Sequence, residues 1–294
     1  MQILVSIPAY NEEATIGQVI DAVNKVLRTN KYSYKILVVD DGSVDNTSAI
    51  AKKRGAVVLR HPLNYGLAET FRTELNYFLA SPCNIFVHID ADGQYRAEDI
   101  PRLVTEVERG YDLVLGDRFA GGVEGMPWLK RLGNRAFSRV ISNIIRHKIN
   151  DCQTGFRALN RKAASIPIRS THTYTQEQII RAVKEHLRIK EVPTPFLKRD
   201  GKSRLLKNPF EYATKAWINI LRIYRDYDPL RFFGSIGVIF LAGGFLIGLW
   251  LVYLYLTTGR VGHLPLTILT LLMIVMGIQV IIFGFIADMQ KNDH

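Results

Sequence analysis

The sequence predicts an α/β protein with a mostly parallel sheet and helices on both faces, followed by amphipathic helices and a C-terminal two-helix transmembrane hairpin. Three observations support this class. Short apolar runs alternate with amphipathic stretches up to about residue 117, acidic residues follow several of these runs, and residues 232–287 are almost free of charge. Strands of a parallel sheet are buried on both faces and connected by helices, which produces such an alternation.

The predicted strands are short runs rich in Val, Ile and Leu, and each is followed by a longer stretch with helical periodicity. The strands are expected at residues 3–7, 35–39, 57–59, 84–89 and 113–115, and the helices at 12–28, 46–54, 67–80 and 97–109. In open sheets of this kind, ligands bind outside the carboxyl ends of the strands. That edge is therefore where the sequence places a functional site.

Acidic and polar residues follow the predicted strands at this edge. Tyr10 and Glu12 follow the first strand, Asp40 and Asp41 end the second, and the fourth leads into Asp90-Ala91-Asp92. No G-x-G-x-x-G follows the first strand and no Walker A motif is present, so neither a dinucleotide cradle nor P-loop chemistry is indicated.

The run Asp90-Ala91-Asp92-Gly93-Gln94 has two readings from its residues alone. Two carboxylates one residue apart at a strand tip can converge on Mg²⁺ or Mn²⁺, which prefer oxygen ligands. An ordinary solvated turn remains the alternative. A calcium loop is excluded, because the twelfth residue counted from Asp90 is Pro101 where that loop needs Glu.

The 294 residues carry a formal net charge of +11, and part of this charge lies in a basic amphipathic stretch. Such a helix is typical of an anionic membrane surface, while a helix docked on the core is the alternative. Nucleic acid is not expected as a partner, because apolar spans follow in the chain. The basic residues of the stretch are Arg118, Lys130, Arg131, Arg135, Arg139, Arg146 and Lys148.

Two apolar runs, 232–256 and 264–287, each exceed the ~20 residues that cross a bilayer as a helix. We expect four segments: an α/β domain at 1–204, a membrane-interface segment at 205–231, two transmembrane helices within 232–287 and a short tail at 288–294. Basic residues before the first span predict that the α/β domain and the tail are cytoplasmic. The N-terminus has no signal-peptide pattern, and the two cysteines fit a reducing compartment.

Five motifs in this order resemble family-2 glycosyltransferases of the GT-A fold, and among them the dolichyl-phosphate mannose synthases and polyprenyl-phosphate hexose synthases. The resemblance covers nearly all of residues 1–204. The motifs are IPAYNEE at 7–13, VVDDGS at 38–43, DADGQ at 90–94, GDRF at 116–119 and DCQTGFR at 151–157.

The resemblance implies a role for each motif. Metal ligands for Mg²⁺ or Mn²⁺ would be Asp90, Asp92 and Gln94, and the catalytic residues would be Asp92, Arg118 and Arg131. The nucleotide sugar would be bound by Pro8, Tyr10, Glu12, Val39, Asp41, Asp90, Ala91 and Asp92. Acceptor phosphate and a lid would involve Arg118, Arg131, Arg199, Lys202 and Arg204, and Glu177 lies where relatives often place an acid that could act as base.

The expected activity is transfer of one hexose from a GDP- or UDP-linked sugar to a polyprenyl or dolichyl phosphate at the cytoplasmic membrane face. The resemblance implies direct displacement with inversion. A protein, glycolipid or glycan acceptor and a non-catalytic membrane scaffold remain open alternatives, and pairing of the spans into a homo-oligomer is compatible with the sequence. Ala182 replaces the Trp of the Gln-x-x-Arg-Trp motif, which disfavours a chain-extruding synthase.

Overall fold

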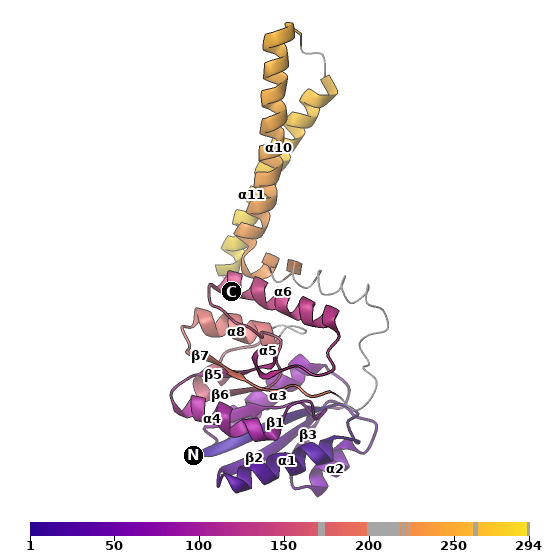
Figure 1. Ribbon diagram of the computed structural model, residues 1–294, viewed down its shortest axis with the longest axis vertical. Coiled ribbons are helices and arrows are strands. Elements are labelled where there is room, and N and C mark those ends of the chain that lie inside the picture. The colour runs from indigo at the N-terminus through magenta and orange to yellow at the C-terminus, as the bar shows by residue number, and fades with distance from the viewer. Residues whose placement is uncertain (170–173, 199–217, 219–220, 223, 261–263, 293–294) are drawn as a thin grey trace. The chain divides into compact units, whose positions relative to one another are not determined.

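The computed structural model describes residues 1–169, 174–198, 218, 221–222, 224–260 and 264–292. It divides into two compact units, Met1–Pro209 and Phe210–His294. The first contains the sheet, and the second contains the two long apolar helices (Figure 1).

The first unit is built on a seven-stranded sheet with the order β3-β2-β1-β4-β6-β5-β7. The strands run parallel to their neighbours, except that β6 is antiparallel to both β4 and β5. The mostly parallel sheet is confirmed, whereas the sequence did not predict β6 and β7. The strands are β1 (Gln2–Ala9), β2 (Ser33–Asp40), β3 (Val57–Arg60), β4 (Ile85–His88), β5 (Leu113–Asp117), β6 (Arg157–Asn160) and β7 (Ile189–Pro193).

Helices cover both faces of the sheet (Figure 1). On one face, α1 (Ile16–Thr29) and α4 (Ile100–Glu108) share a core with alternate residues of β1 and β4. On the other face, α3 (Leu67–Ala80) contacts β1 and β2, and α7 (Arg161–Ala164) contacts α3, β4 and β6. The short α2 (Thr47–Lys53) packs beside β3.

Two predicted helices differ from the structure at their ends. The first begins at Ile16 and not at residue 12, because the N–H groups of Thr15 and Ile16 both donate to the Glu12 carbonyl and form a turn there. The helix expected at 97–109 divides into a 3₁₀ turn, η1 (Ala97–Asp99), and α4, whose second residue is Pro101. Proline fits a first helical turn, where its missing N–H would have no partner.

The predicted basic amphipathic stretch forms α5 (Arg118–Gly121) and α6 (Trp128–Ile145). One face of α6 is buried through Asn134, Phe137, Ser138 and Ile141, at the i, i+3, i+4, i+7 spacing of a docked helix. This helix contacts α8 (Tyr174–Lys184). Trp128 and Leu132 remain exposed. The helix is therefore docked on the core while it also presents apolar side chains outward.

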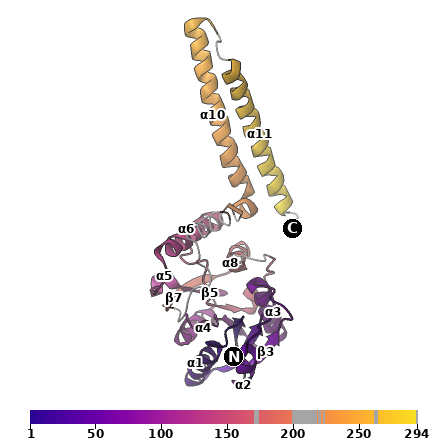
Figure 2. The same ribbon diagram turned by 90° about the vertical axis from the view of Figure 1, so that its right-hand side faces the viewer.

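The second unit is a hairpin of α10 (Pro229–Thr258) and α11 (Leu264–Asn292), which Figure 2 shows side by side. Both are long and apolar enough to cross a membrane, with mean hydropathies of 2.3 and 2.6. A Cβ added to Gly277 would lie 2.9 Å from the Gly237 carbonyl oxygen and 3.0 Å from the Leu241 nitrogen. Small residues thus let the two backbones approach closely, as at packed transmembrane interfaces.

Replacing Gly277 with Val is expected to force α10 and α11 apart and to destabilise the hairpin by about 1–3 kcal/mol, the usual cost of overpacking. Thermal unfolding of the purified protein in detergent measures this. Gly234→Val is the control, because nothing lies within 4 Å of a Cβ at Gly234. Equal effects of the two substitutions would contradict close packing at Gly277.

Candidate active site

A pocket of about 730 Å³ lies at the carboxyl ends of β1, β2, β4 and β5. Its walls also include the loop that enters the antiparallel β6 and the segment after β7. The predicted site residues that line it are Pro8, Tyr10, Glu12, Asp41, Asp90, Ala91, Asp92, Gln94 and Arg118. The structure thus brings these predicted residues together at one edge of the sheet.

Asp41 shapes one end of the pocket by holding the loop between β3 and α3. Its Oδ1 accepts from the Tyr65 N–H at 2.9 Å and lies 2.7 Å from His61 Nδ1, while Oδ2 accepts from the Gly66 N–H at 2.8 Å. Gly66, at φ 90°, lines the pocket. The carboxylate thus already has three protein partners, and it fixes the wall as well as facing the pocket.

Two neighbours of Asp41 support the strand end from beneath. Asp40 is fully buried, and its Oδ1 accepts from the Ser43 N–H at 2.8 Å. Val39 is fully buried within β2 and does not belong to the pocket lining. Val39 is therefore a core residue beneath the pocket and does not contact a ligand there.

Asp90, Asp92 and Gln94 lie together at the end of β4. Asp92 Oδ1 accepts from the Gln94 N–H at 3.1 Å, across a turn in which Gly93 adopts φ 72°. The Gln94 amide nitrogen donates to the Leu197 carbonyl at 2.9 Å, so its oxygen is the atom that can bind a cation. A Cβ at Gly155 would lie 2.8 Å from Asp90 Oδ2, so only glycine leaves room for this carboxylate.

These three residues fit a hard divalent cation as a partial ligand set. Two carboxylates and an amide oxygen are the oxygen ligands that Mg²⁺ prefers, and such ions usually keep positions for water and substrate phosphates. Among the described residues, no group of three or more His, Cys, Asp or Glu side chains could form a metal site. The ligand set formed by Asp90, Asp92 and Gln94 therefore leaves coordination positions for other ligands.

A buried histidine lies behind Asp90. His88 Nδ1 is 2.7 Å from Glu74 Oε2, and its Nε2 is 3.7 Å from Asp90 Oδ1, a distance of an ion pair rather than of a hydrogen bond. Burial by itself would lower the pKa of His88, but the Glu74 carboxylate and Asp90 outweigh it and raise this pKa to about 9. The imidazole is therefore cationic at neutral pH. The sequence analysis did not single out Glu74 or His88.

Arg118 lines the pocket, and its guanidinium forms an ion pair with Asp151. Its Nε donates to Asp151 Oδ2 at 2.6 Å and its Nη2 to Oδ1 at 2.8 Å, and the guanidinium carbon lies 5.2 Å from the centre of the Phe196 ring. Burial opposes the charge, yet Tyr95 and Asp151 raise the pKa of Arg118. The arginine is thus a fixed positive charge, with two of its N–H groups already used.

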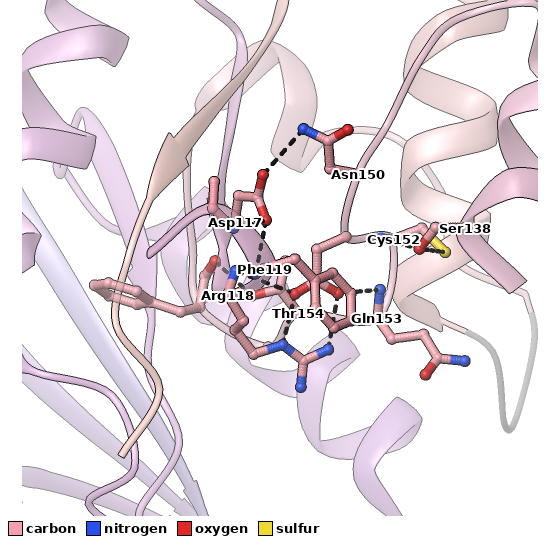
Figure 3. A network of polar contacts seen from close by, with 12 residues as sticks. Asp117, Arg118, Phe119, Ser138, Asn150, Cys152, Gln153 and Thr154 are labelled. Atoms are coloured by element: carbon pink, nitrogen blue, oxygen red, sulfur yellow. Dashed lines mark hydrogen bonds and ion pairs between the residues drawn. The ribbon is translucent and has the colours of Figure 1, made fainter. Parts of the chain in front are cut away.

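The loop around Asp151 is held by neighbouring polar groups, which Figure 3 shows from close by. Asp117 at the end of β5 accepts from the Phe119 and Ala120 N–H groups at the start of α5 and from the Asn150 side chain at 3.0 Å. Ser138 Oγ of α6 lies 3.3 Å from Cys152 Sγ, and burial raises the pKa of this thiol to about 12. Cys152 is therefore an inert packing residue.

The pocket wall includes two further cations, Lys130 and Lys198. Arg131, which the sequence analysis favoured for phosphate binding, does not belong to the lining, and its buried Nε has no hydrogen-bond partner among the described residues. Adjacent side chains of a helix point about 100° apart. Of Lys130 and Arg131, only Lys130 therefore lines the pocket.

The other predicted residues are separate from the pocket lining or lie outside the described residues. Glu177 is buried, pairs with Arg181 at 2.7 Å and accepts from the Arg169 N–H at 3.0 Å. It does not belong to the lining. Arg199, Lys202 and Arg204 lie outside the described residues.

Sequence reasoning missed the residues that reach the pocket from the antiparallel part of the sheet. Gln153 and Gly155 line it, and Tyr95 Oη accepts from the Gly155 N–H at 3.1 Å. Burial raises the pKa of Tyr95 to about 12. The glycine in the DCQTGFR motif was the available signal, although its contact with Asp90 required knowledge of β6.

Comparison with known proteins identifies the family of this chain. A model described as glycosyl transferase family 2 matches residues 4–165. The dolichyl-phosphate hexose transferase of Haloferax volcanii is 34% identical over 216 residues, 73% of this chain and 90% of that protein. The polyprenol monophosphomannose synthase of Mycolicibacterium smegmatis is 27% identical over 210 residues, 67% of this chain and 78% of that protein.

The fold also has solved counterparts. The crystal structure of glucosyl-3-phosphoglycerate synthase from Mycobacterium tuberculosis, with Mn²⁺ and UDP-glucose, matches with a TM-score of 0.58 at 24% identity. The match covers 76% of this chain and 78% of that chain. At this identity the likeness shows the fold.

The Arg118–Asp151 pair predicts a large stability effect. Asp151→Asn leaves a buried guanidinium without its carboxylate and is expected to lower the free energy of unfolding by about 3–5 kcal/mol. Asp21→Asn removes the more exposed pair with Arg54 and should cost under about 1 kcal/mol. Denaturant unfolding compares the two variants, and similar losses would contradict the structural role of the buried pair.

Proposed function

The chain belongs to glycosyl transferase family 2, and we propose that it transfers one hexose from a GDP- or UDP-linked sugar to a polyprenyl or dolichyl phosphate. The observation that carries this proposal is the pocket itself, in which Asp90 and Asp92 share one cavity with Arg118, Lys130 and Lys198. Acids that can bind a cation and bases that can bind a phosphate are what such a transfer requires.

The donor is proposed to bind at the carboxyl ends of β1, β2 and β4. Pro8, Tyr10 and Glu12, with the wall that Asp41 holds, would receive the nucleoside. Asp90, Asp92 and the Gln94 oxygen would hold Mg²⁺ or Mn²⁺ against the diphosphate. The related fold of an enzyme crystallised with Mn²⁺ and UDP-glucose supports the use of a divalent cation.

The acceptor phosphate is proposed to bind on the basic side of the pocket. Lys130 and Lys198 would bind it together with Arg118, because all three line the cavity, whereas Arg131 does not. Arg118, held by Asp151, would contribute a fixed positive charge and its remaining N–H groups. Arg199, Lys202 and Arg204 would act as a lid over the phosphates.

The chemistry requires little proton transfer. A bound divalent cation supplies positive charge that stabilises the nucleoside diphosphate as it leaves. A phosphate monoester has a second pKa of about 6, so the acceptor is largely dianionic at neutral pH and needs no general base. The ion-paired Glu177 is accordingly not needed as one. The chain's own residues position the two substrates. Direct displacement with inversion is the course that the family resemblance implies.

The hairpin is proposed to span the membrane twice, with the first unit and the C-terminal tail in the cytoplasm. Two apolar helices of sufficient length and the basic residues that precede them support this orientation. Lipid contacts are then expected for the hairpin, and its pairing between subunits would give a homo-oligomer.

The activity is tested with purified protein in detergent, Mn²⁺, polyprenyl phosphate and a panel of labelled GDP- and UDP-hexoses. One donor should yield a labelled glycolipid. Asp92→Asn should lower kcat by at least about 10²-fold, because it removes charge that holds the cation. Asp21→Asn, which changes an exposed carboxylate, serves as the control. No transfer from any donor would contradict the proposal.

Removal of the metal gives an independent prediction. Chelation with EDTA should abolish transfer by the wild-type protein, and added Mn²⁺ or Mg²⁺ should restore it, because the protein supplies only part of the charge that the diphosphate needs. Initial rates against free metal concentration measure the dependence. Full activity in EDTA would contradict a metal-dependent mechanism.

The same assay separates the alternatives. A peptide, glycolipid or glycan acceptor that is labelled in place of the lipid phosphate would favour the related transferase class. A scaffold without activity would show no Asp92→Asn effect, because there would be no transfer to lose. The positively charged side of the pocket favours the lipid phosphate among these acceptors.

A further inference from the structure

Glu74 and His88 form a fully buried polar pair directly beneath the metal end of the pocket. Glu74 comes from the middle of α3, and His88 is the last residue of β4. Neither side chain is exposed to solvent, and Nδ1 of the imidazole lies 2.7 Å from Oε2 of the carboxylate. Neither residue lines the pocket.

The surroundings of this pair are largely aromatic. Side chains alternate along β4, so Phe86 and His88 point to the α3 side of the sheet. The Phe71 ring lies 5.3 Å from the imidazole, edge to face, and the Tyr174 ring lies 6.4 Å away. Burying polar groups in such a place is costly, even where they are hydrogen-bonded to one another. Two phenylalanine-sized or aliphatic residues would fill this space at lower cost.

One atom of the pair is directed toward the pocket. Among the described residues, His88 Nε2 has no hydrogen-bond partner, and it lies 3.7 Å from Asp90 Oδ1. Asp90 is the only member of the three that reaches the cavity; a third of its side chain is exposed. On its other side, the carboxylate lies against Gly155. Asp90 is thus confined between an imidazole and a glycine.

A buried arginine near His88, Arg157, forms its hydrogen bonds with groups other than Asp90. Arg157 lies opposite His88 in the register of β4 and β6. Its guanidinium donates to the Gln178 side chain and to the carbonyl groups of Thr154 and Gly155. None of these bonds goes to Asp90, which leaves the imidazole to orient the carboxylate.

We propose that Glu74 and His88 are positioning residues that fix the carboxylate of Asp90 in the orientation that binds the divalent cation. Glu74 fixes the imidazole ring, and the ring fixes Asp90. The terminal torsion of an aspartate is broad, so a partner behind the carboxylate restricts it before the cation arrives. Groups that orient metal ligands in this way typically contribute 10–100-fold to metal affinity. The proposal rests on the proposed function, in which Asp90 is a metal ligand.

The test measures Mn²⁺ binding to the full-length protein in detergent by titration calorimetry, and separately the metal dependence of hexose transfer. Glu74→Gln and His88→Gln should each weaken the Kd for Mn²⁺ by about 10–100-fold. The concentration of Mn²⁺ that gives half-maximal rate should rise by a similar factor, while kcat at saturating metal changes little. The double variant should lose about as much as either single variant, because both act through one ring.

Asp112→Asn is the matched control. Asp112 is also a buried carboxylate, which accepts from the Asn160 side chain and the Arg188 N–H, both at 2.8 Å. It precedes β5, at the sheet edge opposite the pocket. The Asp112→Asn substitution should lower the stability of the protein without changing the Kd for Mn²⁺. His88→Phe, made together with Glu74→Gln so that no buried carboxylate loses its partner, is a second variant, because an aromatic ring fits the apolar surroundings; it should fold and should bind Mn²⁺ as weakly as His88→Gln.

A folded Glu74→Gln protein, or a folded protein that carries both Glu74→Gln and His88→Phe, with wild-type affinity for Mn²⁺ would overturn the inference and assign the pair to stability alone. This outcome differs from failure of the proposed function, in which the wild-type protein transfers no hexose to lipid phosphate whatever its metal affinity.

Discussion

Carboxylates that end neighbouring parallel strands meet at one edge of the sheet, where their negative charges repel one another. The other residues of the site stabilise these charges. Each buried acid has a specific partner. Asp41 accepts from backbone N–H groups of the next loop, Asp117 from the first turn of α5, and Asp151 from Arg118. Hydrogen bonds to ionised carboxylates are the stronger class, so these partners hold the strand ends while stabilising their charge.

Asp90 and Asp92 differ from these acids in their position. Both line the pocket, and two basic residues, Lys130 and Lys198, also line this cavity. The two kinds of charge fit two phosphate-bearing substrates, one bound through a cation and one bound directly. Positioning and charge neutralisation can then accomplish the transfer without a dedicated proton acceptor.

Local pattern was enough to predict the strands up to β5, the edge of the sheet that carries the site and the two apolar helices. What it could not supply were contacts between distant segments. The approach of Gly155 to Asp90 depends on the antiparallel β6, and the choice of Lys130 over Arg131 depends on the rotation of α6 about its axis. The helices α1 and α4 both begin later than predicted, because a turn precedes α1 and a 3₁₀ segment precedes α4.

One missed feature did leave a signal in the sequence. A histidine within Phe86-Val87-His88-Ile89, an otherwise apolar run, must be buried in a parallel sheet and therefore needs a polar partner. The identity of that partner, Glu74 on α3, could not be read from the sequence, because nothing in a helical pattern specifies which strand a polar residue faces.

In the proposed complex, the acids at the end of β4 hold the donor's diphosphate through a divalent cation. Diffraction from crystals grown with Mn²⁺ and a nucleoside diphosphate, measured for the anomalous signal of manganese, tests it most directly. We expect one manganese peak at bonding distance from carboxylate oxygens of Asp90 and Asp92 and from the diphosphate. A diphosphate bound in the pocket with no manganese at these carboxylates would contradict the account.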